Sequence, residues 1–162
     1  REQHIRRDKA TSNICTAQVL LAVIAGMYAV YHGAEGLKQI SDRIHRLTAT
    51  LATGLQQFGF KLGTEPFFDT LRVLAARQVE EICDRALTKQ INLRKIDAET
   101  IGISLDETTS EKDLQDLLEI FAGRSVSLPT SATAQIPSTF ARTSAYLTHP
   151  VFSADQSGLE LI

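Results

Sequence analysis

Three side chains near the C-terminal end of the sequence could take part in chemistry: Arg142, Thr148 and His149. His149 has a titratable ring, lies beside a hydroxyl and is fixed in its loop by Pro150, so it could transfer a proton or bind an anion. The alternative is a histidine in a surface loop or an interface. Arg142, which two hydroxyl residues follow, could bind a carboxylate or a phosphate, or it could dock on a neighbouring domain. Both interpretations stay open for each residue.

Neither cysteine is interpreted as a reactive or disulfide-bonded thiol. Cys15 and Cys83 are too few and too far apart for a disulfide framework, and no secretory start precedes them, which favours a reducing, intracellular setting. Cys15 falls in the expected first turn of a helix, where the helix dipole favours a thiolate, yet a buried, inert thiol is the better interpretation. Cys83 falls on the apolar stripe of a predicted helix, so we expect it in the core.

Motifs and charge exclude several classes of function. The sequence lacks the glycine-rich phosphate-binding, serine-hydrolase and zinc-protease motifs, and its histidines and cysteines lack paired metal-ligand spacing. A formal charge of −2 indicates neither nucleic acid nor an anionic membrane as a partner. Residues 11–31 carry no charge and approach the roughly 20 residues of a membrane span. Polar residues interrupt that run, so we expect no span.

The elements that must position these residues begin with two helices. Residues 19–30 are apolar almost throughout, which predicts a helix buried nearly all round and ending by Gly33. Residues 34–58 have apolar side chains three and four positions apart, which predicts a second helix packed on one side. The short connection between them predicts a helical hairpin.

Shorter elements follow. Residues 67–75 predict a strand with Leu71 and Val73 on one face, residues 78–89 a helix, and residues 91–97 and 100–107 a pair of strands. Thr108 and Glu111 have the spacing of a capping box, and the helix that they would open ends at Gly123. Residues 124–141, rich in Ser, Thr, Ala and Pro, predict an irregular connector.

This order of elements predicts an α/β (α+β) fold with a small mixed or antiparallel sheet and helices on one side. We divide the chain into a junction with a long buried helix (residues 1–33), a small α/β domain (residues 34–123), and a connector with a tail (residues 124–162). Because the sequence begins with Arg1 rather than Met, we expect a piece of a longer polypeptide.

Three stretches carry a resemblance to a known family. They are REQHIRRDKATSNICTAQ at residues 1–18, MYAVYHGAEGLKQISDRIHRLT at residues 27–48, and STFARTSAYLTHPVF at residues 138–152. In this order they resemble the glycine decarboxylase P-protein family of the glycine cleavage system. After HPVF the family continues with an asparagine and a His-Ser-Glu stretch, from which residues 153–162 depart.

The resemblance implies an enzyme that decarboxylates glycine on pyridoxal phosphate and passes the aminomethyl group to the lipoyl arm of the H-protein. It implies the small C-terminal domain of an aspartate-aminotransferase-like fold, late in the N-terminal half of the enzyme. The cofactor lysine of the family lies in the other half, so we expect no cofactor on this chain. None of its lysines matches that motif: Lys9, Lys38, Lys61, Lys89, Lys95 and Lys112.

The resemblance also implies partners. These are the catalytic half of the P-protein and the lipoylated H-protein, within a homodimer of the full chain or a heterotetramer of split halves. The setting would be the bacterial cytoplasm or the mitochondrial matrix. Arg142, Thr148 and His149 would lie in a loop near the active site of the catalytic half, and the polar turn at residues 11–16 would line the vestigial site of this half. The alternative function is a non-catalytic helical domain that binds a partner through residues 34–58.

Overall fold

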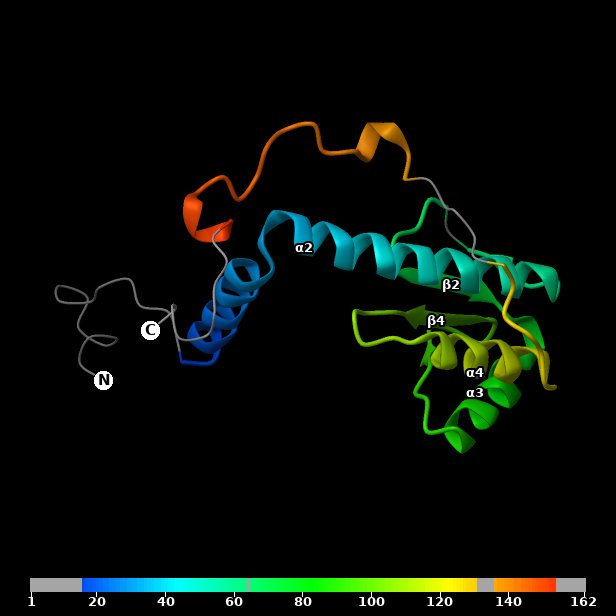
Figure 1. Cartoon of the computed structure of the whole chain (residues 1–162). Helices are drawn as coiled ribbons and strands as arrows, with labels where there is room; N and C mark the ends of the chain where they lie inside the picture. Colours follow the sequence, from blue (N-terminus) through cyan, green and yellow to red (C-terminus); the bar gives the residue numbers. More distant parts are fainter. Residues whose placement is uncertain (1–15, 64, 131–135, 154–162) are drawn as a thin grey trace. The chain divides into compact units, whose positions relative to one another are not determined.

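A computed structural model of the chain describes residues 16–63, 65–130 and 136–153 (Figure 1). The chain divides into two compact units, one of residues 1–37 and 144–162 and the other of residues 38–143. Helix α2 (Thr16–Gln57) contributes to both.

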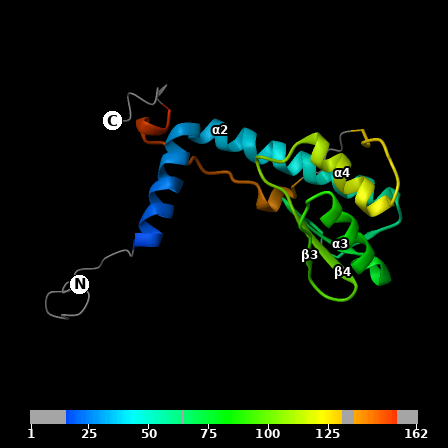
Figure 2. The ribbon, with the colours of Figure 1, turned by 90° about the horizontal axis from the view of Figure 1, so that it is seen from below.

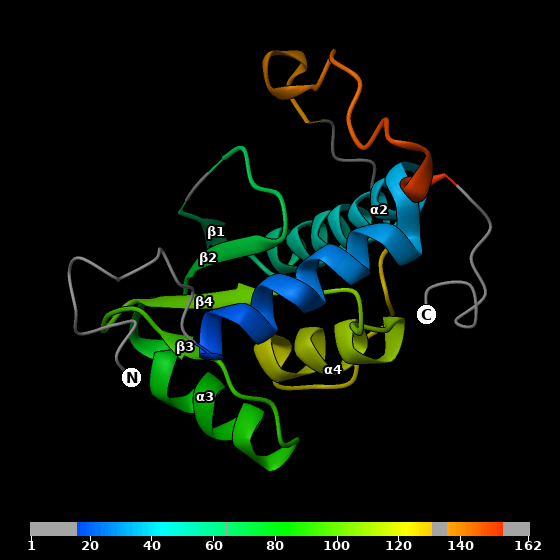
Figure 3. The same ribbon diagram turned by 90° about the vertical axis from the view of Figure 1, so that its left-hand side faces the viewer.

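The unit of residues 38–143 is built on a four-stranded sheet. Its strands are β1 (Lys61–Leu62), β2 (Thr70–Leu74), β3 (Arg94–Lys95) and β4 (Thr100–Ser104), in the order β1-β2-β4-β3. All three pairings are antiparallel, and Figure 3 shows the four strands side by side. The structure confirms the α+β class and the small antiparallel sheet that the sequence predicts. The strand expected over residues 67–75 is shorter than predicted.

Alternation along β2 and β4 gives the sheet one apolar face. Leu71 pairs with Ile103 and Val73 with Ile101, and all four side chains are buried. Since side chains alternate between the faces of a strand, the residues between them lie on the opposite face. Thr70, Arg72 and Ser104, the next residues along the strands, are exposed there. One face therefore joins the core and the other faces solvent.

Three helices cover the apolar face: the second part of α2, α3 (Val79–Thr88) and α4 (Glu111–Ala122). Leu51 and Leu55 of α2 are fully buried, as the predicted stripe requires. Gly54 lets α2 approach α4 closely, because a Cβ there would lie 2.5 Å from Leu118 Cδ2. Cys83 is buried as predicted. The sequence pattern also places Leu87 on the apolar stripe of this helix, which is wrong, because Leu87 is 63% exposed.

The N-cap of helix α4 lies two residues later in the sequence than predicted. Ser110, not Thr108, accepts a hydrogen bond from the Asp113 N–H, and the Asp113 carboxylate accepts one from the Ser110 N–H in return. Thr108 instead donates its hydroxyl to Asp106 Oδ1 at 2.7 Å. The capping box is therefore present but involves a different pair. Gly123 ends the helix in the left-handed conformation, as predicted.

Helix α2 contradicts one prediction. Two helices meet within it at Gly33, the residue that the sequence predicts to end the first of them, and their arrangement as a hairpin stays a prediction. The first part is not buried nearly all round, because the described residues leave a stripe of large apolar side chains exposed. We call this set the apolar stripe, and it comprises Val19, Leu20, Leu21, Val23, Ile24, Met27 and Tyr31.

The apolar stripe also gives α2 a membrane-like composition. Residues 18–57 are long and apolar enough to cross a membrane by length and composition, and only 6% of the most apolar window is buried. A helix that packs against another part of a protein passes the same test.

Candidate functional site

The interruption of α2 at Gly33 is the centre of the candidate site. Gly33 has φ 61° and ψ −175°, a backbone conformation that is essentially restricted to glycine. The residue is buried, and a side chain on it would collide with the carbonyl oxygen of Phe152. A glycine at this position therefore serves two purposes, since it permits the bend and makes room for the returning tail.

The tail is held against this bend by a second contact. The Tyr146 hydroxyl donates a hydrogen bond to the Ala34 carbonyl oxygen at 2.7 Å, across 112 positions of sequence. Figures 1 and 2 both show the short 3₁₀ helix η3 (Pro150–Phe152), drawn in red, beside the bend of α2. The stretches that meet here are two of those that carry the family resemblance.

Aromatic rings line the helical side of the bend. The His32 ring lies 4.4 Å from the Tyr28 ring and 5.0 Å from the Tyr31 ring, centroid to centroid. We define the kink cluster as Tyr28, Tyr31, His32, Gly33, Ala34, Tyr146 and Phe152. The sequence interpretation did not single out His32 as a candidate, although its four-residue spacing from Tyr28 places both rings on one helix face.

His149 has a structural task at the start of η3. Its Nδ1 accepts a hydrogen bond from the Val151 N–H at 3.2 Å. Because Nδ1 is the acceptor, the neutral ring carries its proton on Nε2. In the part of the chain that the structure describes, no hydroxyl or thiol bonds to His32 or His149. The kink cluster is thus equipped to position a segment, and it shows no nucleophile paired with a base.

The three site residues that the sequence predicts fall in two separately described units. Thr148 and His149 belong to the same compact unit as the kink cluster and are exposed, whereas Arg142 is exposed in the unit of residues 38–143. Their grouping near an active site stays a prediction. The polar turn with Ser12, Asn13 and Cys15 lies outside the described residues.

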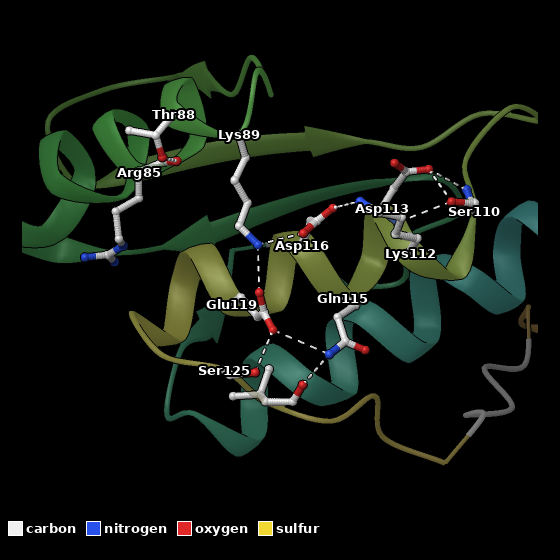
Figure 4. Close-up of polar contacts among 11 residues, drawn as sticks. Arg85, Thr88, Lys89, Ser110, Lys112, Asp113, Gln115, Asp116, Glu119 and Ser125 are labelled. Atoms are coloured by element: carbon white, nitrogen blue, oxygen red, sulfur yellow. Dashed lines mark hydrogen bonds and ion pairs between the residues drawn. The ribbon is translucent and has the colours of Figure 1, made fainter.

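A second polar group lies between α3 and α4 (Figure 4). Lys89 Nζ donates to Asp116 Oδ1 at 2.6 Å and to Glu119 Oε2 at 2.7 Å, and Lys112 Nζ donates to Asp116 Oδ2 at 2.7 Å. These hydrogen bonds raise the pKa of Lys89 and Lys112 and lower the pKa of both carboxylates. We call these four residues the α3–α4 network. It keeps both lysines as ammonium groups, which are poor nucleophiles.

Two further side chains have settled roles in the core. Burial raises the pKa of the Cys83 thiol, which agrees with an inert core residue. His45 donates from Nδ1 to the Phe68 carbonyl at 2.9 Å and stacks on the Phe68 ring, while its buried Nε2 has no partner among the described residues. Across those residues, no group of three or more His, Cys, Asp or Glu side chains could hold a metal ion.

The chain is an α+β segment whose small sheet is covered by helices on one side. The tail held against the bend of α2 forms a positioning site. The described residues contain no complete catalytic centre. The family model of the glycine cleavage system P-protein matches residues 1–121. The chain belongs to this P-protein family.

Individual relatives agree. A glycine dehydrogenase (decarboxylating) from Nostoc punctiforme is 54% identical over 100% of this chain, which corresponds to 18% of that relative. Proteins with the same description from Paraburkholderia phytofirmans and Thermosynechococcus vestitus are 48% and 55% identical over 100% and 94% of this chain. This chain covers 18% and 16% of the length of these two relatives. The chain thus spans less than a fifth of the relatives that it matches.

Proposed function

We propose that this chain is part of an enzyme that decarboxylates glycine on pyridoxal phosphate and transfers the aminomethyl group to the lipoyl arm of an H-protein. The observation that carries the proposal is the identity of about one half, over the whole chain, with proteins described as glycine dehydrogenase (decarboxylating). The chain itself contributes structure and interface to that enzyme.

Three of the described lysines, Lys89, Lys95 and Lys112, do not suit the cofactor's lysine site. Pyridoxal phosphate is held through a lysine that must lose its proton to react, which requires a lowered pKa. Lys89 and Lys112 belong to the α3–α4 network and Lys95 pairs with Glu80, and in each case the carboxylate partner raises the pKa. We therefore assign the cofactor lysine to another part of the enzyme and route no step of the reaction through this chain.

The apolar stripe supports the interface role. Leu20, Leu21 and Val23 are each more than half exposed, which is costly for a helix in water and suits one that another surface covers. We assign the chain to the small domain of an aspartate-aminotransferase-like fold, with residues 1–33 at its junction with the cofactor domain. Its partners would be the catalytic half and the H-protein, in a homodimer or a heterotetramer of split halves, in the bacterial cytoplasm or the mitochondrial matrix.

The second candidate is a non-catalytic helical interaction domain. The apolar stripe also favours this function, although it lies on residues 19–31, whereas the exposed side chains of residues 38–57 are polar. The two candidates differ in what covers the stripe. The remainder of the P-protein covers it in the first, and a separate protein covers it in the second.

The test compares the complete P-protein with this chain alone. The complete protein, loaded with pyridoxal phosphate and given H-protein, should release carbon dioxide from labelled glycine. The chain alone should form no borohydride-fixed lysine adduct with pyridoxal phosphate, as read by mass spectrometry. A complete protein that leaves glycine intact would overturn the proposed activity, and an adduct on the isolated chain would overturn the assignment of the cofactor lysine elsewhere.

A further inference from the structure

The solvent-facing side of the sheet carries two arginines on either side of a glycine. Arg72 of β2 and Arg94 of β3 are both direct cross-strand neighbours of Gly102 in β4. Residues that face each other across a sheet lie on the same side of it. The two exposed guanidinium groups therefore stand on one face, with a residue that has no side chain between them.

The spacing of the two arginines suits a small anion. Neighbouring strands lie about 4.8 Å apart, so two strands on either side of a third are separated by about 10 Å. Gly102 itself is buried, because the Ile96 side chain covers it: a Cβ on Gly102 would lie 3.2 Å from Ile96 Cδ1. A phosphate or carboxylate group fits between two guanidinium groups that donate in pairs.

Two hydroxyl side chains lie beside the arginines on the same face of the sheet. Thr70 and Ser104 form the next pair on this face, and their hydroxyl oxygens lie 3.0 Å apart. All five residues line one cavity of about 620 Å³, within the size range of small-molecule sites. The cavity also has apolar lining from Ile91, Leu93 and Leu117.

The charged residues around Arg72 and Arg94 leave both arginines available to bind an anion. In the described residues, Lys89, Lys95, Lys112 and Arg85 all form ion pairs with carboxylates, whereas Arg72 and Arg94 form none. Asp113 also lines the cavity, but Ser110 occupies its Oδ2 through the N–H and the hydroxyl. The pKa of Asp97 is lowered chiefly by the hydrogen bond from the Glu99 N–H to its Oδ1, and the charge of Arg72 lowers it further.

We propose that Arg72 and Arg94, with Thr70 and Ser104, form a binding site for a small organic anion whose carboxylate or phosphate lies between the two guanidinium groups and whose apolar part enters the cavity. This arginine pair is distinct from the kink cluster. The site does not depend on the proposed enzymatic function, since all its residues belong to the unit of residues 38–143.

The test is a nuclear magnetic resonance titration of the whole 162-residue chain at constant ionic strength. The probes are inorganic phosphate and succinate, with sodium chloride as the reference salt. Each probe should cause saturable shifts of the Gly102 amide and of the Arg72 and Arg94 Nε–H signals, with a dissociation constant on the order of 1 mM. Tighter binding of phosphate than of succinate would identify a phosphate site, and the reverse order a carboxylate site.

Three variants establish which side chains are responsible. Arg72→Gln and Arg94→Gln should each weaken binding about tenfold, because each removes a charge-assisted hydrogen-bonding group. Arg94→Lys should weaken it less, because the charge remains and only the paired donation is lost. Arg77→Gln is the matched control, with the same loss of charge on an exposed residue outside the cavity, and should bind as the wild type does.

Two results would overturn the proposal. One is a set of non-saturating shifts that sodium chloride reproduces. The other is binding that Arg77→Gln weakens as much as Arg94→Gln does, because that result would mean a general effect of net charge. The three substituted side chains are exposed, and a circular dichroism melt of each of the four variants separates weakened binding from loss of fold.

Discussion

The carbonyl oxygen of Phe152 occupies the space that a side chain on Gly33 would need. This contact joins positions more than a hundred residues apart. Together with the hydrogen bond from Tyr146 to the Ala34 carbonyl, it makes the bend of α2 and the returning tail one structural feature. The bend is thus supported from outside the helix as well as permitted by the glycine.

Replacing Gly33 with Ala should destabilise this feature. The backbone conformation at Gly33 costs a residue with a side chain about 1–3 kcal/mol, and the collision with Phe152 adds to that cost. We expect amide hydrogen exchange at residues 146–153 to accelerate at least tenfold. Gly26→Ala is the control, because a Cβ there meets nothing within 4 Å and alanine favours a helix. Equal exchange in the two variants would contradict the proposed coupling.

The two parts of α2 should respond differently to truncation. Leu51→Ala should cost about 2–5 kcal/mol of unfolding free energy, because Leu51 is fully buried. Leu20→Ala should cost less than about 0.5 kcal/mol in this chain, because Leu20 is 61% exposed. Urea denaturation measures both. In the complete P-protein, Leu20→Ala should become clearly destabilising if the apolar stripe is covered there, and an unchanged small effect would count against the interface role.

The elements of the sheet unit could be predicted from the sequence because their signals are local. Alternation placed Leu71, Val73, Ile101 and Ile103 on one face, and a three-and-four spacing placed Leu51 in the core. The burial of residues 19–30 could not be predicted in this way. A dense apolar run is compatible with a core helix and equally with a helix that another surface covers. The sequence pattern does not distinguish them.

The break between two helices at Gly33 could be predicted, because its signal is also local. Gly33 has the properties of a residue that ends a helix, and it does leave the helical conformation. No proline follows it, however, and the next residues favour a helix, so α2 resumes at once. The contact of the tail with the bend has no local signal at all, since Tyr146 and Ala34 are 112 positions apart.

Two single substitutions test which residue caps the start of α4. Ser110→Ala should cost about 1 kcal/mol, because it leaves the Asp113 N–H without its acceptor at the start of α4. Thr108→Ala should cost less, since Thr108 bonds only to Asp106 in an exposed turn. Denaturation of both variants measures the difference. A larger loss of unfolding free energy from Thr108→Ala would mean that Thr108 is the cap, as the sequence predicts.

The α3–α4 network should make stability depend on acidic pH. Hydrogen bonds from Lys112 and Lys89 lower the pKa of Asp116 below its ordinary 3.8, and one from Lys89 lowers that of Glu119 below its ordinary 4.5. Because the folded-state pKa is the lower one in each case, the stabilisation is complete above the unfolded-state pKa. It is lost as the pH falls through the folded-state pKa.

We therefore expect the free energy of unfolding to fall on acidification below about pH 4.5, and to fall less steeply in the double variant Asp116→Asn/Glu119→Gln. Urea denaturation at pH 7 and at pH 3.5 measures the difference. Glu99→Gln is the control, since the Glu99 side chain is exposed and forms no ion pair with a described residue. If the double variant lost as much stability as the wild type between these two pH values, the α3–α4 network would not be the source of the acid sensitivity.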